Sequence, residues 1–517
     1  MDSELITVLI QLLEHSISVL NLYSINRRKY EKDIFIIALI AGTSFSSCED
    51  FLNQVPEHEL VQENAVIDYN SAKNIVNGMY SNYASSKNMG GYIYGNLHMQ
   101  AGIYKTGGKS AEAFYNMTYN QSTDESTTYT FNIWNDLYIC INAANAAIKG
   151  VSDLDVSKFP SEKIKNDLIA EARCFRGFIN LQLMWLFSHW FDNAESPYGI
   201  LYRDQLSDLS NLMIDRSSVG DSYQYIIDDF EYAEQNLHDY TSAKYMSKQF
   251  AQVMHAKLLL VRGWEGDYAK ALELVNNVIS TAPSIFKMEP NITKLYEDAW
   301  DSNEVLFARY LGQGDLTWDL YNYEYTYSKG LYDSEFRDIP NEWIEKDERH
   351  DYTFGEAGGG ENWQADIINE NVLTKLYHRG AANGPNDKYC TYVFRYAELY
   401  LMKAELLART NPSDIQGALK PLNDMRAQYT TPVMAPITGV TTYEQLMDAI
   451  FKEYVVTLLM ENETPWFASV RFKKDGKTWL EVLKPDVNIS TNKYCWPIPY
   501  AEIIAHTNKI EQNPGLE

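Results

Sequence analysis

The feature that most constrains the fold of this chain is a repeated amphipathic-helix pattern. Between Leu168 and Trp190, apolar side chains recur at spacings of three and four residues. This spacing places them along one stripe of a helix with 3.6 residues per turn, and such a stripe has to be buried against another element. The same pattern occurs at Met246 to Leu260, Tyr268 to Ile279, Tyr396 to Leu406 and Ala418 to Ala427. The chain is therefore predicted to be mostly α-helical.

Four of these stretches form two pairs, each joined by a short connection. In the first pair, Gly266 and Ala271 stand at the start of the second helix, where small residues allow two helices to pack closely. In the second pair, Asn411 and Pro412 close the first helix. Both pairs are similar to tetratricopeptide units, although no strict repeat period is present. We predict a tetratricopeptide-like scaffold of helical pairs.

Three long segments have a different composition. Asn88 to Thr130, Gly312 to Tyr332 and Gly355 to Asn386 are rich in Gly, Asn or Tyr. Long loops in a compact domain are usually functional. We therefore expect irregular, partly β insertions near 88–130 and 312–386, and we expect them to form the ligand-binding face.

Tyrosine clusters lie within two of these segments. Tyrosine occupies every second position at Tyr321, Tyr323, Tyr325 and Tyr327, so in an extended strand the four rings share one face. Trp318 precedes them. Tyr92 and Tyr94 show the same spacing after two glycines. A sugar ring has apolar C–H faces and a rim of hydroxyls, which an aromatic ring with polar neighbours can hold. The predicted glycan-binding residues are Tyr92, Tyr94, Trp318, Tyr321, Tyr323 and Tyr325. The alternative is that these rings pack onto the scaffold.

The first residues are typical of a secretory leader that ends at Cys48. Four basic residues between Arg27 and Lys32 precede a short apolar run and then a stretch of small residues. The string Phe45 to Cys48 resembles a lipobox, in which the cysteine receives the lipid anchor. We predict a leader over 1–47, of which 1–26 is a misassigned start, and a single domain over 48–517.

Charge and motifs exclude several functions. The chain carries 44 basic and 70 acidic side chains, a net charge of −26, which repels nucleic-acid phosphates. It contains no HExxH, GxSxG or GxGxxG motif, and no histidine or cysteine pair has the spacing of metal ligands. We expect no nucleic-acid partner, no metal and no cofactor.

Two glutamates come into question as catalytic acids. Glu171 lies near Arg173, and Glu398 lies near Arg395. A structural ion pair or hydrogen-bond network explains these arrangements better than a catalytic pair does. No catalytic residue is predicted.

Several segments resemble the SusD/RagB family of surface lipoproteins. Leu168 to Gly177 is similar to its first helix motif, and Phe394 to Glu405 is similar to its R-Y-A-E-x-Y-L-x-x-A-E helix. Trp496 to Pro499 and Gln512 to Gly515 resemble its P-I-P and Q-N-P-G tail. The family's E-R-x-x-E segment is matched only loosely, between Lys452 and Arg471.

The resemblance implies a cell-surface lipoprotein, anchored in the outer membrane through Cys48. It would bind an oligosaccharide or other glycan and deliver it to a SusC-like TonB-dependent transporter, without catalytic activity. Two alternatives from other classes stay open. One is a helix-rich glycoside hydrolase that shares the aromatic groove, and the other is an adhesin or purely structural partner of the transporter.

Overall fold

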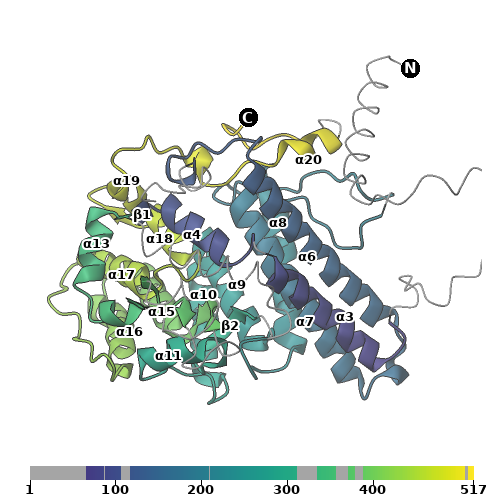
Figure 1. Ribbon diagram of the computed structural model, residues 1–517, viewed down its shortest axis with the longest axis horizontal. Coiled ribbons are helices and arrows are strands. Elements are labelled where there is room, and N and C mark those ends of the chain that lie inside the picture. Colours follow the sequence, from purple (N-terminus) through teal and green to yellow (C-terminus); the bar gives the residue numbers. More distant parts are fainter. Residues whose placement is uncertain are drawn as a thin grey trace, which may run out of the picture. The chain divides into compact units, whose positions relative to one another are not determined.

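The computed structural model describes residues 66–86, 88–105, 117–208, 210–310, 335–356, 371–378, 388–506 and 510–517. These residues belong to one compact unit, 62–517. Helices dominate it, as the sequence predicts, and the strands are short (Figure 1). None of the helices in the described ranges has the length and apolar composition that a membrane span requires.

The first group of helices comprises α3 (Tyr69–Ser85), α6 (Thr128–Asp153), α7 (Glu162–Phe187) and α8 (Val219–Asn236), which lie side by side (Figure 1). Polar caps begin three of them: the side chains of Asp68, Ser161 and Ser218 accept from backbone N–H groups in the first turn. The predicted apolar stripe of α7, including Phe175 and Ile179, is buried. Cys140 on α6 and Cys174 on α7 are also buried, as small apolar residues of the core.

Both predicted helical pairs are confirmed. The first is α9 (Lys248–Arg262) with α10 (Asp267–Thr281), and the second is α15 (Tyr396–Thr410) with α16 (Ile415–Gln428). Gly263, with φ of 66°, ends α9 in the left-handed region that glycine adopts without strain. Helix α10 also packs against α15, so the two pairs join into one layer, which α17 (Tyr443–Thr457) and α18 (Thr464–Arg471) extend.

The strands form five separate two-stranded antiparallel ladders in the described part of the chain. β1 (Tyr104–Lys105) pairs with β3 (Glu335–Phe336), and β2 (Val305–Arg309) pairs with β8 (Thr391–Arg395). β4 (Phe354–Glu356) pairs with β5 (Asn371–Leu373), β6 (Tyr377–His378) with β7 (Lys388–Tyr389), and β9 (Lys473–Lys474) with β10 (Lys477–Thr478). The expectation of partly β insertions is thereby confirmed.

Short elements complete the fold. The remaining helices are α11 (Ile292–Asp298), α13 (Asp338–Glu345), α14 (His350–Thr353), α19 (Trp479–Leu483) and α20 (Tyr500–Ala505). Short 3-10 helices span Val156–Lys158, Ala299–Asp301 and Thr491–Lys493.

One expected insertion contains a helix near its start. Helix α4 (Gly91–Gln100) lies inside the 88–130 segment, and α6 begins at Thr128. Every residue of α4 is buried, so it has no polar face and shows no amphipathic period. His98 fixes its position: Nδ1 lies 2.9 Å from the Tyr94 carbonyl, and Nε2 accepts from the Met460 N–H at 2.9 Å.

Candidate functional site

Short strand pairs bound the segments in which the sequence predicts ligand contacts. In the β1–β3 pair, Lys105 lies opposite Glu335. The chain therefore enters 106–116 and leaves 311–334 at neighbouring positions. In β4–β5, Glu356 lies opposite Asn371, and in β6–β7, His378 lies opposite Lys388. The β4–β5 and β6–β7 pairs thus each hold together the two ends of a stretch largely within 355–386, and the β1–β3 pair joins the start of 106–116 to the end of 311–334.

These ladders are connected to each other. The rings of Phe336 on β3 and Phe354 on β4 meet edge to face, with centroids 5.9 Å apart. Between β5 and β6, the Thr374 N–H donates to the Thr353 carbonyl, and beyond β7 the Cys390 N–H donates to the Leu376 carbonyl. We call β1, β3, β4, β5, β6 and β7 together the loop-bearing ladders. They are the candidate functional site because 106–116 begins on them, 311–334 ends on them, and 357–370 and 379–387 each begin and end on them.

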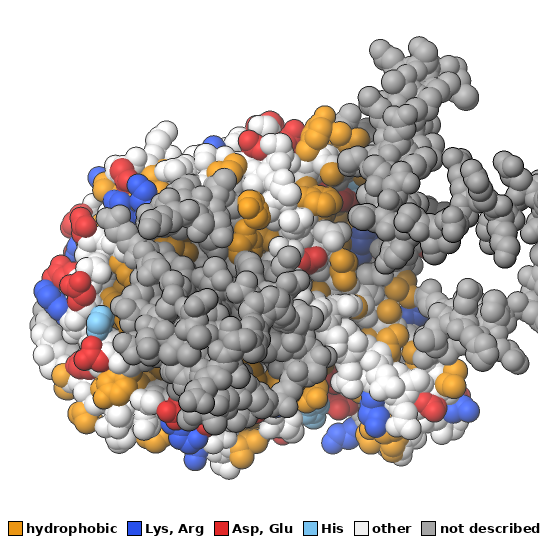
Figure 2. Space-filling model, viewed as in Figure 1, with side chains coloured by type: hydrophobic (Ala, Val, Ile, Leu, Met, Phe, Trp, Pro, Cys, Tyr) orange, Lys and Arg blue, Asp and Glu red, His pale blue; other side chains and the backbone are white. Residues whose placement is uncertain are grey.

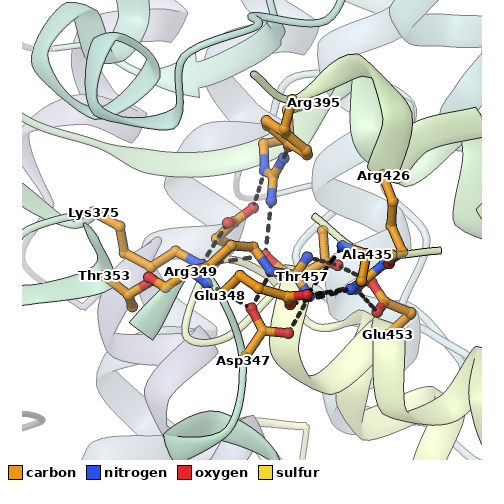
Figure 3. A network of polar contacts seen from close by, with 12 residues as sticks. Asp347, Glu348, Arg349, Thr353, Lys375, Arg395, Arg426, Ala435, Glu453 and Thr457 are labelled. Atoms are coloured by element: carbon orange, nitrogen blue, oxygen red, sulfur yellow. Dashed lines mark hydrogen bonds and ion pairs between the residues drawn. The ribbon is translucent and has the colours of Figure 1, made fainter. Parts of the chain in front are cut away.

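A buried polar network attaches the loop-bearing ladders to the helices (Figure 3). Arg349, just before α14, donates two hydrogen bonds to Asp347, at 2.6 and 2.8 Å. The same guanidinium donates to the Thr457 hydroxyl at 2.6 Å and lies 3.2 Å from Glu453 on α17. The connection between α13 and β4 is therefore fixed to the C-terminal half of α17.

The β5–β6 turn and β8 meet the same network. Lys375 Nζ lies 2.7 Å from Glu461 Oε1, and Arg395 donates to the other oxygen of Glu461 at 2.7 Å. Arg395 also donates to Glu304 at 2.6 Å and to the Thr457 carbonyl at 2.7 Å. One guanidinium thus joins β8 to the residues that precede β2 and to the end of α17.

Helix α16 closes the network through Arg426, which lies 2.7 Å from Glu453 and 3.1 Å from Glu348. We call the whole set the anchoring network. It contains four cations and five carboxylates: Arg349, Lys375, Arg395 and Arg426 with Glu304, Asp347, Glu348, Glu453 and Glu461.

In the anchoring network, neighbouring charges of opposite sign offset the cost of burying each ionised group. Burial alone would raise the pKa of Glu461, but Arg395 and Lys375 overcome that effect and bring the pKa below its ordinary value. Burial lowers the pKa of Lys375 to about 8, although Glu461 opposes the shift. Cations neighbour each carboxylate, so the arrangement serves to hold the ladders.

The two glutamates considered as catalytic acids also have structural partners, but not the expected ones. Glu171 accepts from the Tyr80 hydroxyl at 2.6 Å, while Arg173 pairs with Asp229 at 2.7 Å. Residues two apart on a helix point to different sides, which separates Glu171 from Arg173. Glu398 lies 2.9 Å from Lys257. Arg395 is the N-terminal cap of α15, and its backbone is still extended. Its side chain therefore leaves in a different direction from that of Glu398.

Tyr92 and Tyr94 do not lie on an extended strand. Both belong to α4, where a spacing of two residues sends the rings to different sides. Tyr92 is 4% exposed and Tyr94 is 1% exposed, and the Gln182 amide donates to the Tyr94 hydroxyl at 3.3 Å. The prediction of two rings on one exposed face is wrong here, because α4 is enclosed by the helical body.

The other predicted site residues lie outside the described residues: Trp318, Tyr321, Tyr323, Tyr325 and the lipid-anchor residue Cys48. Sequence reasoning missed the anchoring residues Arg349 and Lys375. A usable signal existed, because Lys375 lies within the Gly- and Asn-rich segment 355–386 and Arg349 precedes that segment. In the described residues, no group of three His, Cys, Asp or Glu side chains could hold a metal ion.

Two family models match the chain. The model described as "SusD family" matches residues 368–516, and the one described as "Starch-binding associating with outer membrane" matches residues 50–259. The first contains the anchoring residues Lys375, Arg395 and Glu461, and the second contains α4.

Comparison with individual proteins gives the same family. The chain is 22% identical over 533 residues to the SusD-like protein P38 of Formosa agariphila, covering 93% of this chain and 97% of that protein. A solved SusD superfamily protein from Bacteroides thetaiotaomicron is 20% identical, with a TM-score of 0.65, and the match covers 87% of this chain and all of that one (100%). A laminarin-binding SusD-like protein is 18% identical, with a TM-score of 0.64 and coverages of 87% and 100%. At these identities the solved structures show a shared fold.

Proposed function

Because this chain is a member of the SusD/RagB family, we propose that it is a cell-surface lipoprotein that captures oligosaccharides and delivers them to a SusC-like TonB-dependent transporter. The observation that carries the proposal is the match of residues 50–259 to a family described as starch-binding and associated with the outer membrane. A solved neighbour with the same fold is described as laminarin-binding.

Glycan contact is assigned to the segments that the loop-bearing ladders carry. The proposed stacking rings are Trp318, Tyr321, Tyr323 and Tyr325, since Tyr92 and Tyr94 are buried in α4. Stacked aromatic rings orient the sugar, and neighbouring polar side chains select its hydroxyls. A rigid base supports this role, because ordering a loop on binding costs affinity. Affinity should be modest, since a delivery protein has to release its ligand.

The proposed anchor is a lipid on Cys48. In cells fed an alkyne-tagged fatty acid, the wild-type full chain should become labelled and the Cys48→Ser variant should not. The variant should also be absent from the outer-membrane fraction. Equal labelling of both proteins would refute the anchor and leave glycan capture untouched.

Capture without cleavage separates this proposal from a hydrolase. A glycan-array screen of the soluble chain beginning after Cys48 is expected to identify at least one bound glycan. Incubation with that glycan should release no reducing sugar. Array binding with reducing-sugar release would favour the hydrolase, and complex formation with the transporter without any glycan binding would favour the adhesin or structural partner.

A further inference from the structure

Three cations surround the ring of one buried tyrosine at the edge of the loop-bearing ladders. The Nζ atoms of Lys484 and Lys105 lie 4.9 and 5.6 Å from the ring centroid of Tyr119, and the guanidinium carbon of Arg337 lies 5.7 Å from it. One carboxylate is close by: Asp486 accepts from the Tyr119 hydroxyl at 3.0 Å. We call Lys105, Arg337 and Lys484 the cationic cluster.

The position of the cluster relates it to the proposed glycan contacts. Lys105 is the last residue of β1, and Arg337 follows β3 directly. The Arg337 N–H donates to the Ile103 carbonyl, which fixes its backbone to the β1 side. These are the strands from which 106–116 departs and to which 311–334, the segment with Trp318 and Tyr321, returns. The cluster therefore lies at the base of both segments.

The charges of the cluster are not balanced. Arg337 pairs with Asp486 at 3.3 Å, and the two side chains are 25% and 46% exposed. Lys484 is buried and donates to the Gln100 carbonyl at 3.2 Å. Among the side chains that the structure describes, no carboxylate lies within ion-pair distance of Lys484 or Lys105. Within this described set, Asp486 is the one carboxylate beside the three cations, in a chain whose net charge is −26.

Lys484 is held in place although its charge is poorly compensated. A Cβ atom on Gly102 would lie 2.5 Å from Lys484 Cγ, so the backbone of Gly102 forms a close cover over the lysine stem. Burial lowers the pKa of Lys484 to about 7, and Asp486 opposes the shift while Arg337 adds to it. A bound anion would remove this electrostatic cost.

We propose that the cationic cluster is an anionic subsite, which binds a carboxylate or sulfate substituent of the captured glycan. The guanidinium of Arg337 suits both groups because it can donate two parallel hydrogen bonds to two oxygens, and the lysines add point charges. Asp486 is an internal competitor for Arg337. The inference rests on the proposed function and deepens it, since it specifies the class of glycan.

Affinity electrophoresis with matched polymers tests the subsite. The polymers are polygalacturonate and its carboxyl-reduced form, and κ-carrageenan and its desulfated form. The soluble wild type should be retarded more by at least one anionic polymer than by its neutral partner. The pair that shows the difference distinguishes a carboxylate from a sulfate.

Variants assign the difference to the cluster. Arg337→Gln and Lys105→Gln should each weaken retardation by the anionic polymer about tenfold, the effect of one charge-assisted contact. Asp486→Asn should strengthen it about threefold, because the competing carboxylate is gone. The control, Lys473→Gln with Lys477→Gln on the exposed β9–β10 hairpin, removes charge elsewhere and should leave retardation unchanged.

The outcomes separate the two proposals. If a neutral polymer retards the protein as strongly as its anionic partner does, the subsite is refuted and glycan capture stands. The subsite is also refuted if the hairpin control weakens binding as much as Arg337→Gln, because the attraction would then be non-specific. Failure to bind any polymer or any array glycan would overturn the proposed function, and the subsite with it.

Discussion

The anchoring network and the cationic cluster use the same kinds of charged side chain for different purposes. In the anchoring network, four cations face five carboxylates, and its central residues Arg395 and Glu461 are fully buried. In the cationic cluster, three cations share one carboxylate, and the Arg337–Asp486 pair is partly exposed. Paired charges in the interior serve stability, whereas the partly exposed side chains of Arg337 and Lys105 are accessible to a ligand.

Figure 2 shows one face of the molecule with its side chains coloured by type. In this view, Lys and Arg side chains are scattered among Asp and Glu rather than gathered into a broad basic face. Since the whole chain carries a net charge of −26, the excess of positive charge is local to the cluster. The comparison predicts large stability effects in the anchoring network and small ones in the cluster.

The largest expected effect comes from Arg395→Met. The substitution leaves Glu304 and Glu461 buried without this guanidinium, and it should lower the free energy of unfolding by about 3–5 kcal/mol. Urea denaturation at pH 7 measures the change. The matched control is Lys420→Met, which breaks an exposed pair with Asp424 on α16 and should cost less than about 0.5 kcal/mol. Equal losses would contradict a structural role for the network.

Glu405→Gln should have the next largest effect, about 3 kcal/mol at pH 7. Burial alone would raise the pKa of Glu405, but Arg471 and Arg409 hold it at about 2, below its ordinary value of 4.5. The native carboxylate therefore adds stability above pH 4.5, and this stability is lost as the pH falls towards 2. The gap between wild type and variant should narrow over that range in thermal unfolding. A constant gap would show that the arginines do not act through this charge.

Glu171→Gln should change stability in the opposite direction. Burial raises the pKa of Glu171 to about 7. Its hydrogen-bond donor is the Tyr80 hydroxyl, and the amide oxygen of a glutamine can accept the same hydrogen bond. Since the native pKa lies above 4.5, wild-type stability should fall as the pH rises from 4.5 to 7. At pH 8 the variant should be more stable by about 1–2 kcal/mol. A variant that is less stable at pH 8 would contradict this.

The smallest stability effect is expected for Arg337→Gln. Its pair with Asp486 is partly exposed, so the free energy of unfolding should change by less than about 0.5 kcal/mol while binding of anionic polymer weakens. Denaturation and affinity electrophoresis on the same preparation measure both. A loss as large as that of Arg395→Met would place Arg337 with the anchoring residues and remove the contrast.

The scaffold was predictable because its helices carry apolar residues at helical spacing over three or more turns. Helices α7, α9, α10, α15 and α16 leave a periodic apolar stripe in the sequence, and each lies where that stripe indicates. Helix α4 was missed because its ten residues show no apolar stripe at helical spacing. The alternation of Tyr92 and Tyr94 has the period of a strand, but a burial pattern without a polar face does not distinguish a strand from a helix.

The candidate site was only partly predictable. The Gly- and Asn-rich insertions could be located, but ladders of two or three residues are too short to show alternation. The partners of the anchoring network are separated widely along the chain, as Arg395 is from Glu304 and Glu461. Lys105, Arg337 and Lys484 meet only through the fold, so no local pattern could have joined them.

The most direct test of the account is retardation of the soluble chain in a gel that contains its array-identified glycan. The account predicts that the wild type is retarded and that Trp318→Ala combined with Tyr321→Ala abolishes the retardation with an unchanged unfolding midpoint. Unchanged retardation of the double variant by every glycan that binds the wild type would contradict the claim that these rings hold the sugar.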